Sequence, residues 1–179
     1  GKGIIKVTGI VEEEEMDGKG QKFKRTSSAK SSVENVLTVL KRFLDTDCKE
    51  YDIHLNFPGG IPIDGPSAGI AVATAVYSAI KNIPISSSLA MTGEISIRGK
   101  VKPVGGVVDK VDAARLAGIK KVLIPRENWQ ELFNDMDIEV IPVDDINQVV
   151  DIVFGRKNEK IEDISIQNKA VNMLTASGA

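Results

Sequence analysis

Ser67 and its surroundings have the residue types that nucleophilic chemistry needs. Ser67 follows Pro66 at the start of a helix that we expect to run from Ser67 to about Ile80. Because proline has no N–H to lose and its backbone angle suits a first helical turn, the serine is predicted at the helix mouth. Unpaired N–H groups and the positive end of the helix dipole lie there, and they could bind an oxyanion. A serine that only caps its helix would give the same pattern.

Lys110 is the base that this serine could use. It lies on the apolar side of a helix expected over residues 107–117, at about 100° per residue, whereas Asp109 and Asp112 point away. Burial disfavours the ammonium form, and a lysine can accept a proton near neutral pH if its pKa falls from about 10.4 to about 7–8. The alternative is a lysine that extends its charged end from the apolar face to water.

Other hydrolase patterns involving Ser67 are less consistent with this sequence. The segment 65–69 matches the G-x-S-x-G pattern of α/β-hydrolases, but their histidine follows the serine, and the only histidine here, His54, precedes it. A triad of His54, Asp64 and Ser67 has another known chain order. We favour His54 as a strand residue beside the site.

Ser-x-x-Lys also occurs twice, at residues 27–30 and 78–81. Neither copy is accompanied by the Ser-Asp-Asn and Lys-Thr-Gly motifs of penicillin-binding proteins. Both are typical of an ordinary helix surface.

The composition limits the classes of partner and cofactor. A net charge of -2 does not provide the broad cationic surface that nucleic acids require. Cys48 and His54, the only cysteine and histidine, cannot form an internal disulfide or a Cys/His zinc site. No apolar run approaches the ~20 residues of a membrane-spanning helix. We expect no cofactor or metal in this chain, no nucleic-acid or membrane partner, and a location in the reducing cytoplasm.

Hydrophobic periodicity predicts strands that alternate with helices, which indicates an α/β or α+β layered domain; we favour α+β, with mixed sheet layers and packed helices. An exposed acidic turn is expected over residues 12–18. Strands are expected over residues 3–11, 51–57, 89–92, 95–98, 101–104, 119–124 and 138–141, and helices over 28–44, 67–80, 107–117, 127–133 and 146–154.

One domain is expected over residues 1–154, because 179 residues with 42% hydrophobic content can bury one substantial core. The polar, weakly periodic residues 155–179 are predicted to be a flexible C-terminal tail. The chain begins with Gly1 rather than methionine, which we interpret as a processed product or a fragment of a longer protein.

The sequence closely resembles the proteolytic domain of Lon proteases over roughly residues 30–150. The resemblance rests on segments that follow one another in the family's order, and the first contains Ser67 and the third Lys110. The segments are 57–69 (FPGGIPIDGPSAG), 90–99 (AMTGEISIRG), 103–110 (PVGGVVDK) and 121–128 (KVLIPREN).

The resemblance implies a serine endopeptidase with a Ser-Lys dyad, in which Ser67 is the nucleophile and Lys110 the general base. It also implies that the Thr92 hydroxyl lies beside the lysine ammonium. The loop that contains Asp64 would change shape between inactive and active sites. The form of the motif, Asp64 to Ser67, looks bacterial, and residues 34–40 look like those of a Lon B-type subgroup.

Lon proteases act on unfolded polypeptides as homohexamers, so the resemblance implies these substrates and this assembly. It further implies an upstream ATPase domain. Since this chain has no Gly-x-x-x-x-Gly-Lys-Ser/Thr loop, ATP and Mg²⁺ are expected only in that missing domain. The chain also lacks the further strands that usually precede the segment from Gly3, and it has Asn56 where bacterial relatives often have a histidine.

Two other functions fit parts of the pattern. The first is a catalytically silent Lon-like scaffold for oligomerisation, like those of certain DNA-recombination ATPases, which lack the serine and lysine present here. The second is a different Ser-Lys hydrolase that acts on small amides or esters. Dependence of the rate on peptide length would distinguish it, because a protease uses remote contacts with its substrate.

Overall fold

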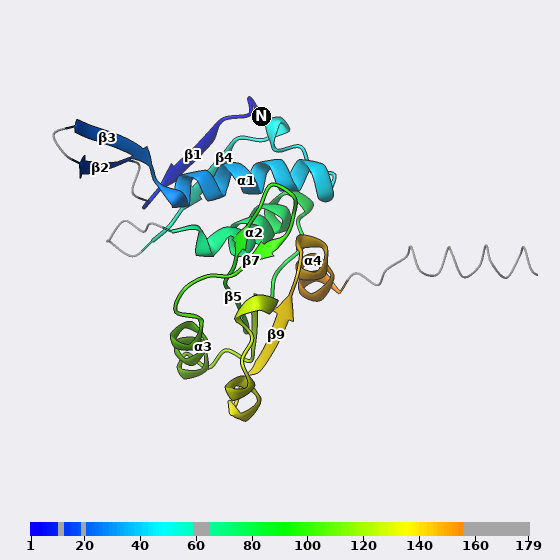
Figure 1. The fold of residues 1–179 in the computed structure, drawn as a ribbon. Helices are drawn as coiled ribbons and strands as arrows, with labels where there is room; N and C mark the ends of the chain where they lie inside the picture. Colours follow the sequence, from blue (N-terminus) through cyan, green and yellow to red (C-terminus); the bar gives the residue numbers. More distant parts are fainter. Residues whose placement is uncertain (11–12, 19–20, 59–64, 156–179) are drawn as a thin grey trace, which may run out of the picture.

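The computed structural model describes residues 1–10, 13–18, 21–58 and 65–155, with the backbone alone for 13–18 and 21–26. Groups of one to three strands alternate with the α-helices along this part of the chain (Figure 1). The helices are α1 (Ser28–Phe43), α2 (Gly69–Lys81), α3 (Val107–Leu116) and α4 (Ile146–Phe154), with the short 3-10 helices η1 (Cys48–Glu50), η2 (Pro66–Ala68), η3 (Arg126–Asn128) and η4 (Glu131–Asp135). The strands are β1 (Ile5–Thr8), β2 (Glu13–Gly18), β3 (Gln21–Thr26), β4 (Ile53–Asn56), β5 (Leu89–Met91), β6 (Glu94–Ile95), β7 (Val101–Lys102), β8 (Lys121–Pro125) and β9 (Glu139–Val143).

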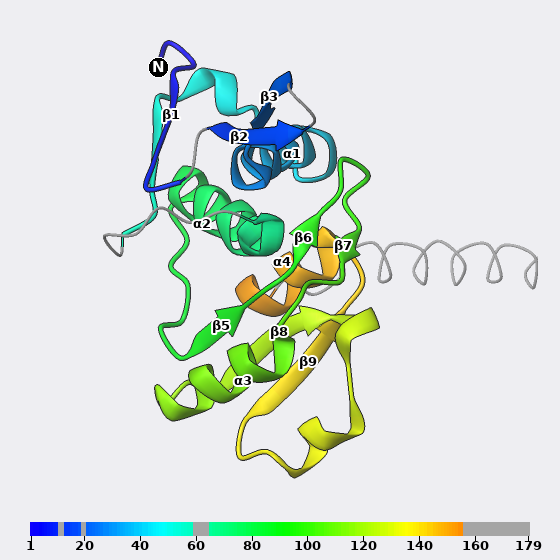
Figure 2. The ribbon, with the colours of Figure 1, turned by 60° about the vertical axis from the view of Figure 1, so that its left-hand side comes forward.

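A parallel three-stranded sheet in the order β5-β8-β9 separates two groups of apolar side chains. Successive side chains of a strand point to opposite faces. Accordingly, Leu123 of β8 packs with residues of α1, α2 and α4, whereas Val122 and Ile124 pack with residues of α3. Figure 2 shows α3 against this sheet, with α4 near the opposite side. The strand β8 is therefore the common support of both layers.

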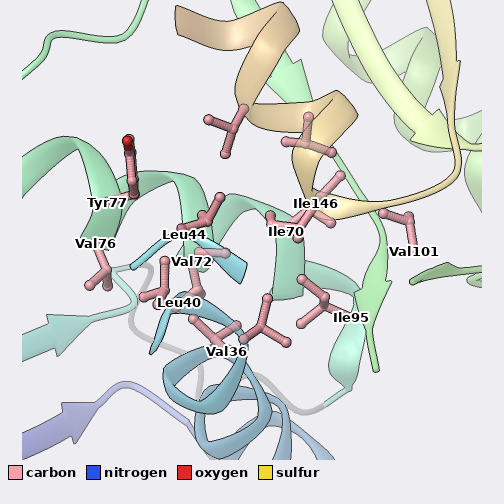
Figure 3. Packing of buried hydrophobic residues seen from close by; sticks show 14 of the residues in the cluster. Val36, Leu40, Leu44, Ile70, Val72, Val76, Tyr77, Ile95, Val101 and Ile146 are labelled. Atoms are coloured by element: carbon pink, nitrogen blue, oxygen red, sulfur yellow. The ribbon is translucent and has the colours of Figure 1, made fainter. Parts of the chain in front are cut away.

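The larger group of buried side chains lies between α1, α2 and α4 (Figure 3). Val36 and Leu40 are one helical turn apart on α1 and are fully buried, as are Ile70 of α2 and Ile146 of α4. Residues four apart lie on one face of a helix, so this spacing makes a continuous apolar stripe. The periodicity that predicts the α1 helix therefore identifies its buried face.

Side-chain caps explain where two of the helices begin. The Ser27 hydroxyl accepts a hydrogen bond from the Lys30 N–H at the start of α1, and the Asp145 carboxylate accepts from the N–H groups of Asn147 and Gln148 at the start of α4. Such caps satisfy N–H groups that have no partner inside the helix. The bounds of α4 are those predicted from the sequence, and α1 ends one residue earlier than predicted.

The acidic turn predicted over residues 12–18 is wrong. Residues Glu13–Gly18 form β2, which pairs antiparallel with β3 (Gln21–Thr26). The register places Glu14 opposite Arg25 and Glu15 opposite Lys24, and oppositely charged cross-strand positions favour pairing. A run of acidic residues does not by itself predict a strand. The strand becomes predictable only when the basic partner strand is known.

Two shorter predictions need adjustment, and two others are not tested. The strand predicted over 95–98 ends at Ile95, because the Ser96 N–H donates to the Lys100 carbonyl and closes a turn toward β7. The helix predicted over 127–133 is instead the pair of 3-10 helices η3 and η4. The predicted tail, from residue 156 onward, lies outside the described residues, and so does Asp64.

Candidate active site

Ser67 lies in η2, the single turn that leads directly into α2. The predicted helix start at Ser67 is thus two residues early, since α2 begins at Gly69, whose N–H donates to the Pro66 carbonyl. Ser67 is half-buried. The nucleophile candidate therefore lies at the N-terminal end of a helix, as the sequence predicts.

Two donors from the β5–β6 connection hold the backbone of Ser67. The Gly93 N–H donates to the Ser67 carbonyl at 2.8 Å, and the Thr92 hydroxyl donates to the same oxygen at 3.2 Å. The Thr92 N–H in turn donates to the carbonyl of Leu123 in β8 at 3.0 Å. The turn that contains the serine is therefore connected through Thr92, whose side chain is buried, to the central strand of the sheet.

A close backbone approach explains Gly69. The Ile70 N–H donates to the Gly93 carbonyl at 3.1 Å, and a Cβ added at Gly69 would lie 2.8 Å from the backbone nitrogen of Ile95. Real Cβ contacts are essentially never that short, and the neighbour is backbone that cannot rotate away. Glycine at this position lets α2 begin against β6.

The helix α1 supports the same turn from another side. The buried Ser32 hydroxyl donates to the Pro66 carbonyl at 3.3 Å. A cavity of about 10 Å³ lies between α1 and this turn, with Ala29, Ser32 and Ala68 among its lining residues. The backbone of Ser67 is consequently fixed by contacts from both α1 and the β5–β6 connection.

Lys110 lies in the first half of α3 and is half-buried. The backbone N–H of Lys110 donates to the carbonyl of Gly106, which has a left-handed conformation (φ 65°) just before the helix. The neighbours Val107 and Val111 are buried against β8, so the apolar face predicted for α3 is confirmed. Ala117, placed on that face by the sequence pattern, is exposed and follows the last residue of the helix.

Asn128 contacts the loop that precedes α3 and was not singled out by the sequence analysis. Its amide nitrogen donates to the Val104 carbonyl at 3.0 Å, and its amide oxygen accepts from the Val104 N–H at 2.8 Å. The segment 121–128 contained the residue, but nothing in its spacing indicates a partner 24 residues away.

The hydrogen bonds and ion pairs between described residues include none made by the Ser67 hydroxyl or the Lys110 ammonium. A direct contact within the dyad therefore stays a prediction, as does the contact of Thr92 with Lys110. The Thr92 hydroxyl lies instead on the carbonyl of Ser67.

His54 is exposed on β4 and is engaged by the neighbouring strand β1. Its Nε2 lies 3.1 Å from the hydroxyl of Thr8, which donates to the Asn56 amide oxygen at 2.9 Å. Which group donates in the first contact depends on the tautomer of the His54 ring. The strand placement predicted for His54 is confirmed, and no described hydrogen bond joins it to Ser67.

The family model of the Lon protease (S16) C-terminal proteolytic domain matches residues 2–156 of the sequence. The chain belongs to this family. The match confirms the resemblance carried by the segments around Ser67 and Lys110, and the mixed helices and sheets agree with the α+β fold expected for a Lon proteolytic domain.

Individual Lon proteases are similar over most of the chain. Lon protease 2 of Bacillus subtilis (strain 168) is 55% identical over 154 residues, which cover 86% of this chain and 28% of that protein. Archaeal Lon protease of Thermococcus kodakarensis is 46% identical over 139 residues (75% of this chain, 22% of that protein). That of Archaeoglobus fulgidus is 43% identical over 140 residues (74% and 22%). The chain thus spans about a quarter of the length of these relatives.

The described part of this Lon proteolytic domain has a further cavity of note, and it offers no metal site or membrane-spanning helix. No group of three or more His, Cys, Asp or Glu residues there could hold a metal ion, and none of its helices is long and apolar enough to cross a membrane. A cavity of about 640 Å³ lies between β1, α1 and η1, with Ile5, Leu37 and Cys48 among its lining residues. Neither Ser67 nor Lys110 lines it.

Proposed function

We propose that this chain hydrolyses peptide bonds of unfolded polypeptides as a serine endopeptidase, with Ser67 and Lys110 as a catalytic dyad. Ser67 Oγ attacks the scissile carbonyl carbon while the neutral Lys110 amine accepts the hydroxyl proton. The tetrahedral intermediate collapses to an acyl-enzyme, and the lysine returns a proton to the leaving amine. Water then attacks the ester, which releases the acid and regenerates the serine.

The observation that carries this proposal is the anchoring of the Ser67 carbonyl by Gly93 and Thr92. Both bonds hold the backbone of the serine and leave its side chain outside the contact. The turn lies at the N-terminal end of α2, where the helix dipole favours negative charge. This arrangement supports a nucleophile whose backbone is rigid and whose developing oxyanion faces a positive field.

Thr92 can serve both members of the dyad. A threonine hydroxyl has one proton to donate and lone pairs with which to accept. While it donates to the Ser67 carbonyl, the same oxygen can accept from the Lys110 ammonium once the lysine has taken up the serine proton. We therefore assign Thr92 the role of orienting Lys110, and we propose that the loop with Asp64 changes shape between the inactive and the active site.

The partners follow from the family. The proposal places the chain next to an ATPase domain in a longer protein, which would unfold substrates with ATP and Mg²⁺, whereas the hydrolytic site itself needs no cofactor. The proposal also includes assembly of that longer protein into a homohexamer and its location in the cytoplasm. That the chain spans 28% of the similar Lon protease 2 is consistent with a further domain in that relative.

Cleavage of a fluorogenic unfolded peptide without ATP tests the proposed function. We expect Ser67→Ala and Lys110→Ala each to lower kcat/KM by about 1,000-fold or more. The matched controls Ser31→Ala and Lys120→Ala, both at exposed positions, should retain activity.

Retention of cleavage by both dyad variants would contradict this mechanism. Activity that does not depend on peptide length would favour a small-amide hydrolase instead. Ring assembly in the absence of any hydrolysis would favour the silent scaffold.

A further inference from the structure

We propose that Asn128 is a positioning residue for Lys110, and that it fixes the start of α3 by binding the backbone of Val104. The inference rests on the proposed function, because it assigns Lys110 the role of base. Asn128 does not itself contact reacting atoms in this account. It acts through the loop 103–106, which connects β7 to the helix that contains the lysine.

The Asn128 side chain binds both polar backbone groups of Val104, its N–H and its carbonyl oxygen. The amide nitrogen of Asn128 donates to the Val104 carbonyl and its oxygen accepts from the Val104 N–H, at 3.0 and 2.8 Å. In a sheet, a neighbouring strand would bind these two backbone groups. Here the Asn128 side chain binds them. Both residues are half-buried, where an unpaired backbone group is costly.

The loop has few other attachments. In the described part of the chain, the hydrogen bonds that join residues 103–106 to other elements are the two from Asn128 and the one that the backbone N–H of Lys110 donates to the Gly106 carbonyl. Pro103 has no N–H to donate, and a Cβ added at Gly105 would meet no atom within 4 Å. Without Asn128, the loop would keep the apolar packing of the Val104 side chain but lose both hydrogen bonds that orient its backbone.

The position of the Lys110 amine depends on this loop. Val107 and Val111 determine which face of α3 lies against β8, whereas the directional hydrogen bonds of Asn128 determine where the backbone enters the helix. The Lys110 N–H is bonded to the carbonyl of Gly106, two residues after Val104, so a shift of Val104 moves the first helical turn and the lysine with it.

Asn128 itself is well anchored to the sheet that also positions Ser67. It ends η3, directly after β8, and Arg126 in the same short helix pairs with Asp144 through two hydrogen bonds of 2.9 and 2.8 Å. Leu123 of β8 accepts from the Thr92 N–H. The strand β8 therefore supports both residues of the dyad. Leu123 binds Thr92, which binds the backbone of Ser67. Asn128, just after the end of the strand, binds the loop that leads to Lys110.

The chemistry of the contact is specific to asparagine. Aspartate has nearly the same shape but no N–H, so it could accept from the Val104 N–H while its charge repels the Val104 carbonyl. Glutamine keeps both groups on a side chain that is one methylene longer. Alanine removes both bonds.

The test compares Asn128→Ala, Asn128→Asp and Asn128→Gln with Asn134→Ala, a control at an exposed position of η4. In peptide cleavage by the full chain, we expect kcat of the alanine and aspartate variants to fall about 10- to 100-fold with KM nearly unchanged, as for a misplaced catalytic group. Glutamine should restore part of kcat, and the control should match the unmodified chain.

Two measurements do not depend on activity. The Val104 amide should be protected from hydrogen exchange in the unmodified chain and should exchange faster in Asn128→Ala. The rate at which an amine-specific reagent modifies Lys110, measured by peptide mass mapping, should change in the same variant, while the rate at the exposed Lys120 stays constant. These results would stand even if the unmodified chain cleaved no peptide, so a failure of the proposed function is distinguishable.

Several outcomes would overturn the inference. One is unchanged kcat in both Asn128→Ala and Asn128→Asp; another is a rise in KM alone, which would indicate substrate binding. Unchanged Val104 exchange together with unchanged Lys110 reactivity would also overturn it. If Asn128→Ala does not fold, then kcat, Val104 exchange and Lys110 reactivity of Asn128→Asp test the inference in its place.

Discussion

At the scale of single residues, the candidate site is held mainly by side chains that bind backbone atoms. Thr92 donates to the carbonyl of Ser67, Ser32 to that of Pro66, and Asn128 binds both groups of Val104. Each of these contacts joins residues more than 20 positions apart in the sequence. They determine where the serine turn and the lysine helix lie relative to the sheet.

Ser32→Ala tests the support that α1 gives to the nucleophile turn. Loss of its hydrogen bond to the Pro66 carbonyl should cost about 0.5–1.5 kcal/mol of the free energy of unfolding. We expect kcat/KM for peptide cleavage to fall about two- to tenfold, because the backbone of Ser67 is then held from one side only. Chemical denaturation and peptide kinetics measure the two effects.

The neighbouring Ser31→Ala is the matched control. Ser31 is exposed, and its hydroxyl donates to the carbonyl of Ser27, the residue that caps the same helix. Equal losses of activity in Ser31→Ala and Ser32→Ala would show that the contact with Pro66 has no special role.

The types and spacing of residues were enough to single out Ser67 and Lys110 as candidates, because a serine after proline and a lysine on an apolar face are local patterns. They could not find Ser32 or Asn128. A serine in a helix and an asparagine after a strand are common, and their partners are backbone atoms that look alike at every position. Only the folded chain brings Ser32 to Pro66 and Asn128 to Val104.

At the scale of elements, helices with a complete apolar stripe and a capping residue could be predicted from sequence. The bounds of α4 follow from its hydrophobic spacing, Asp145 before it and Gly155 after it. Elements that depend on a distant partner could not be predicted in this way. The hairpin of β2 and β3 needs the pairing of acidic with basic positions, and β6 is two residues long.

The N-terminal segment offers a test by pH. The Asp52 carboxylate accepts from the N–H groups of Ile4 and Lys2, at 3.1 and 2.7 Å, and these hydrogen bonds hold the pKa of Asp52 below its usual range. A carboxyl whose pKa is depressed by folding stabilises the folded state above its unfolded pKa of about 3.9. That contribution is lost as the pH falls through the lower folded pKa.

We therefore expect the unmodified chain to have a higher Tm than Asp52→Asn near pH 6, and this difference to shrink below about pH 4. Thermal unfolding of both proteins between pH 2 and 7 measures it. A difference that grows as the pH falls would contradict the assigned role of Asp52.

At the scale of the whole molecule, the two apolar clusters share one strand. Leu40 belongs to the cluster of α1, α2 and α4, Ile124 to the cluster under α3, and both are fully buried. Since Leu123 and Ile124 are adjacent in β8, neither cluster can lose its packing without disturbing the strand of the other. The described part of the chain is expected to unfold as one cooperative unit.

Leu40→Ala and Ile124→Ala test this coupling. Each should lower the free energy of unfolding by about 2–5 kcal/mol, as is typical of large-to-small changes in a core. Both should move one single transition, seen alike by circular dichroism and by Trp129 fluorescence. Leu116→Ala, at a position that is 72% exposed, should have little effect. Separate transitions for the two variants would show that the clusters are independent.

The central claim is that Ser67 forms an acyl-enzyme with the help of Lys110. Its most direct test is to mix the chain with a peptide thioester, quench with acid within the first turnover, and locate any bound acyl group by peptide mass mapping. The account predicts an acyl group on Ser67, none at this position in Ser67→Ala, and much slower acylation in Lys110→Ala. An acyl group on another residue, or undiminished acylation in Lys110→Ala, would contradict it.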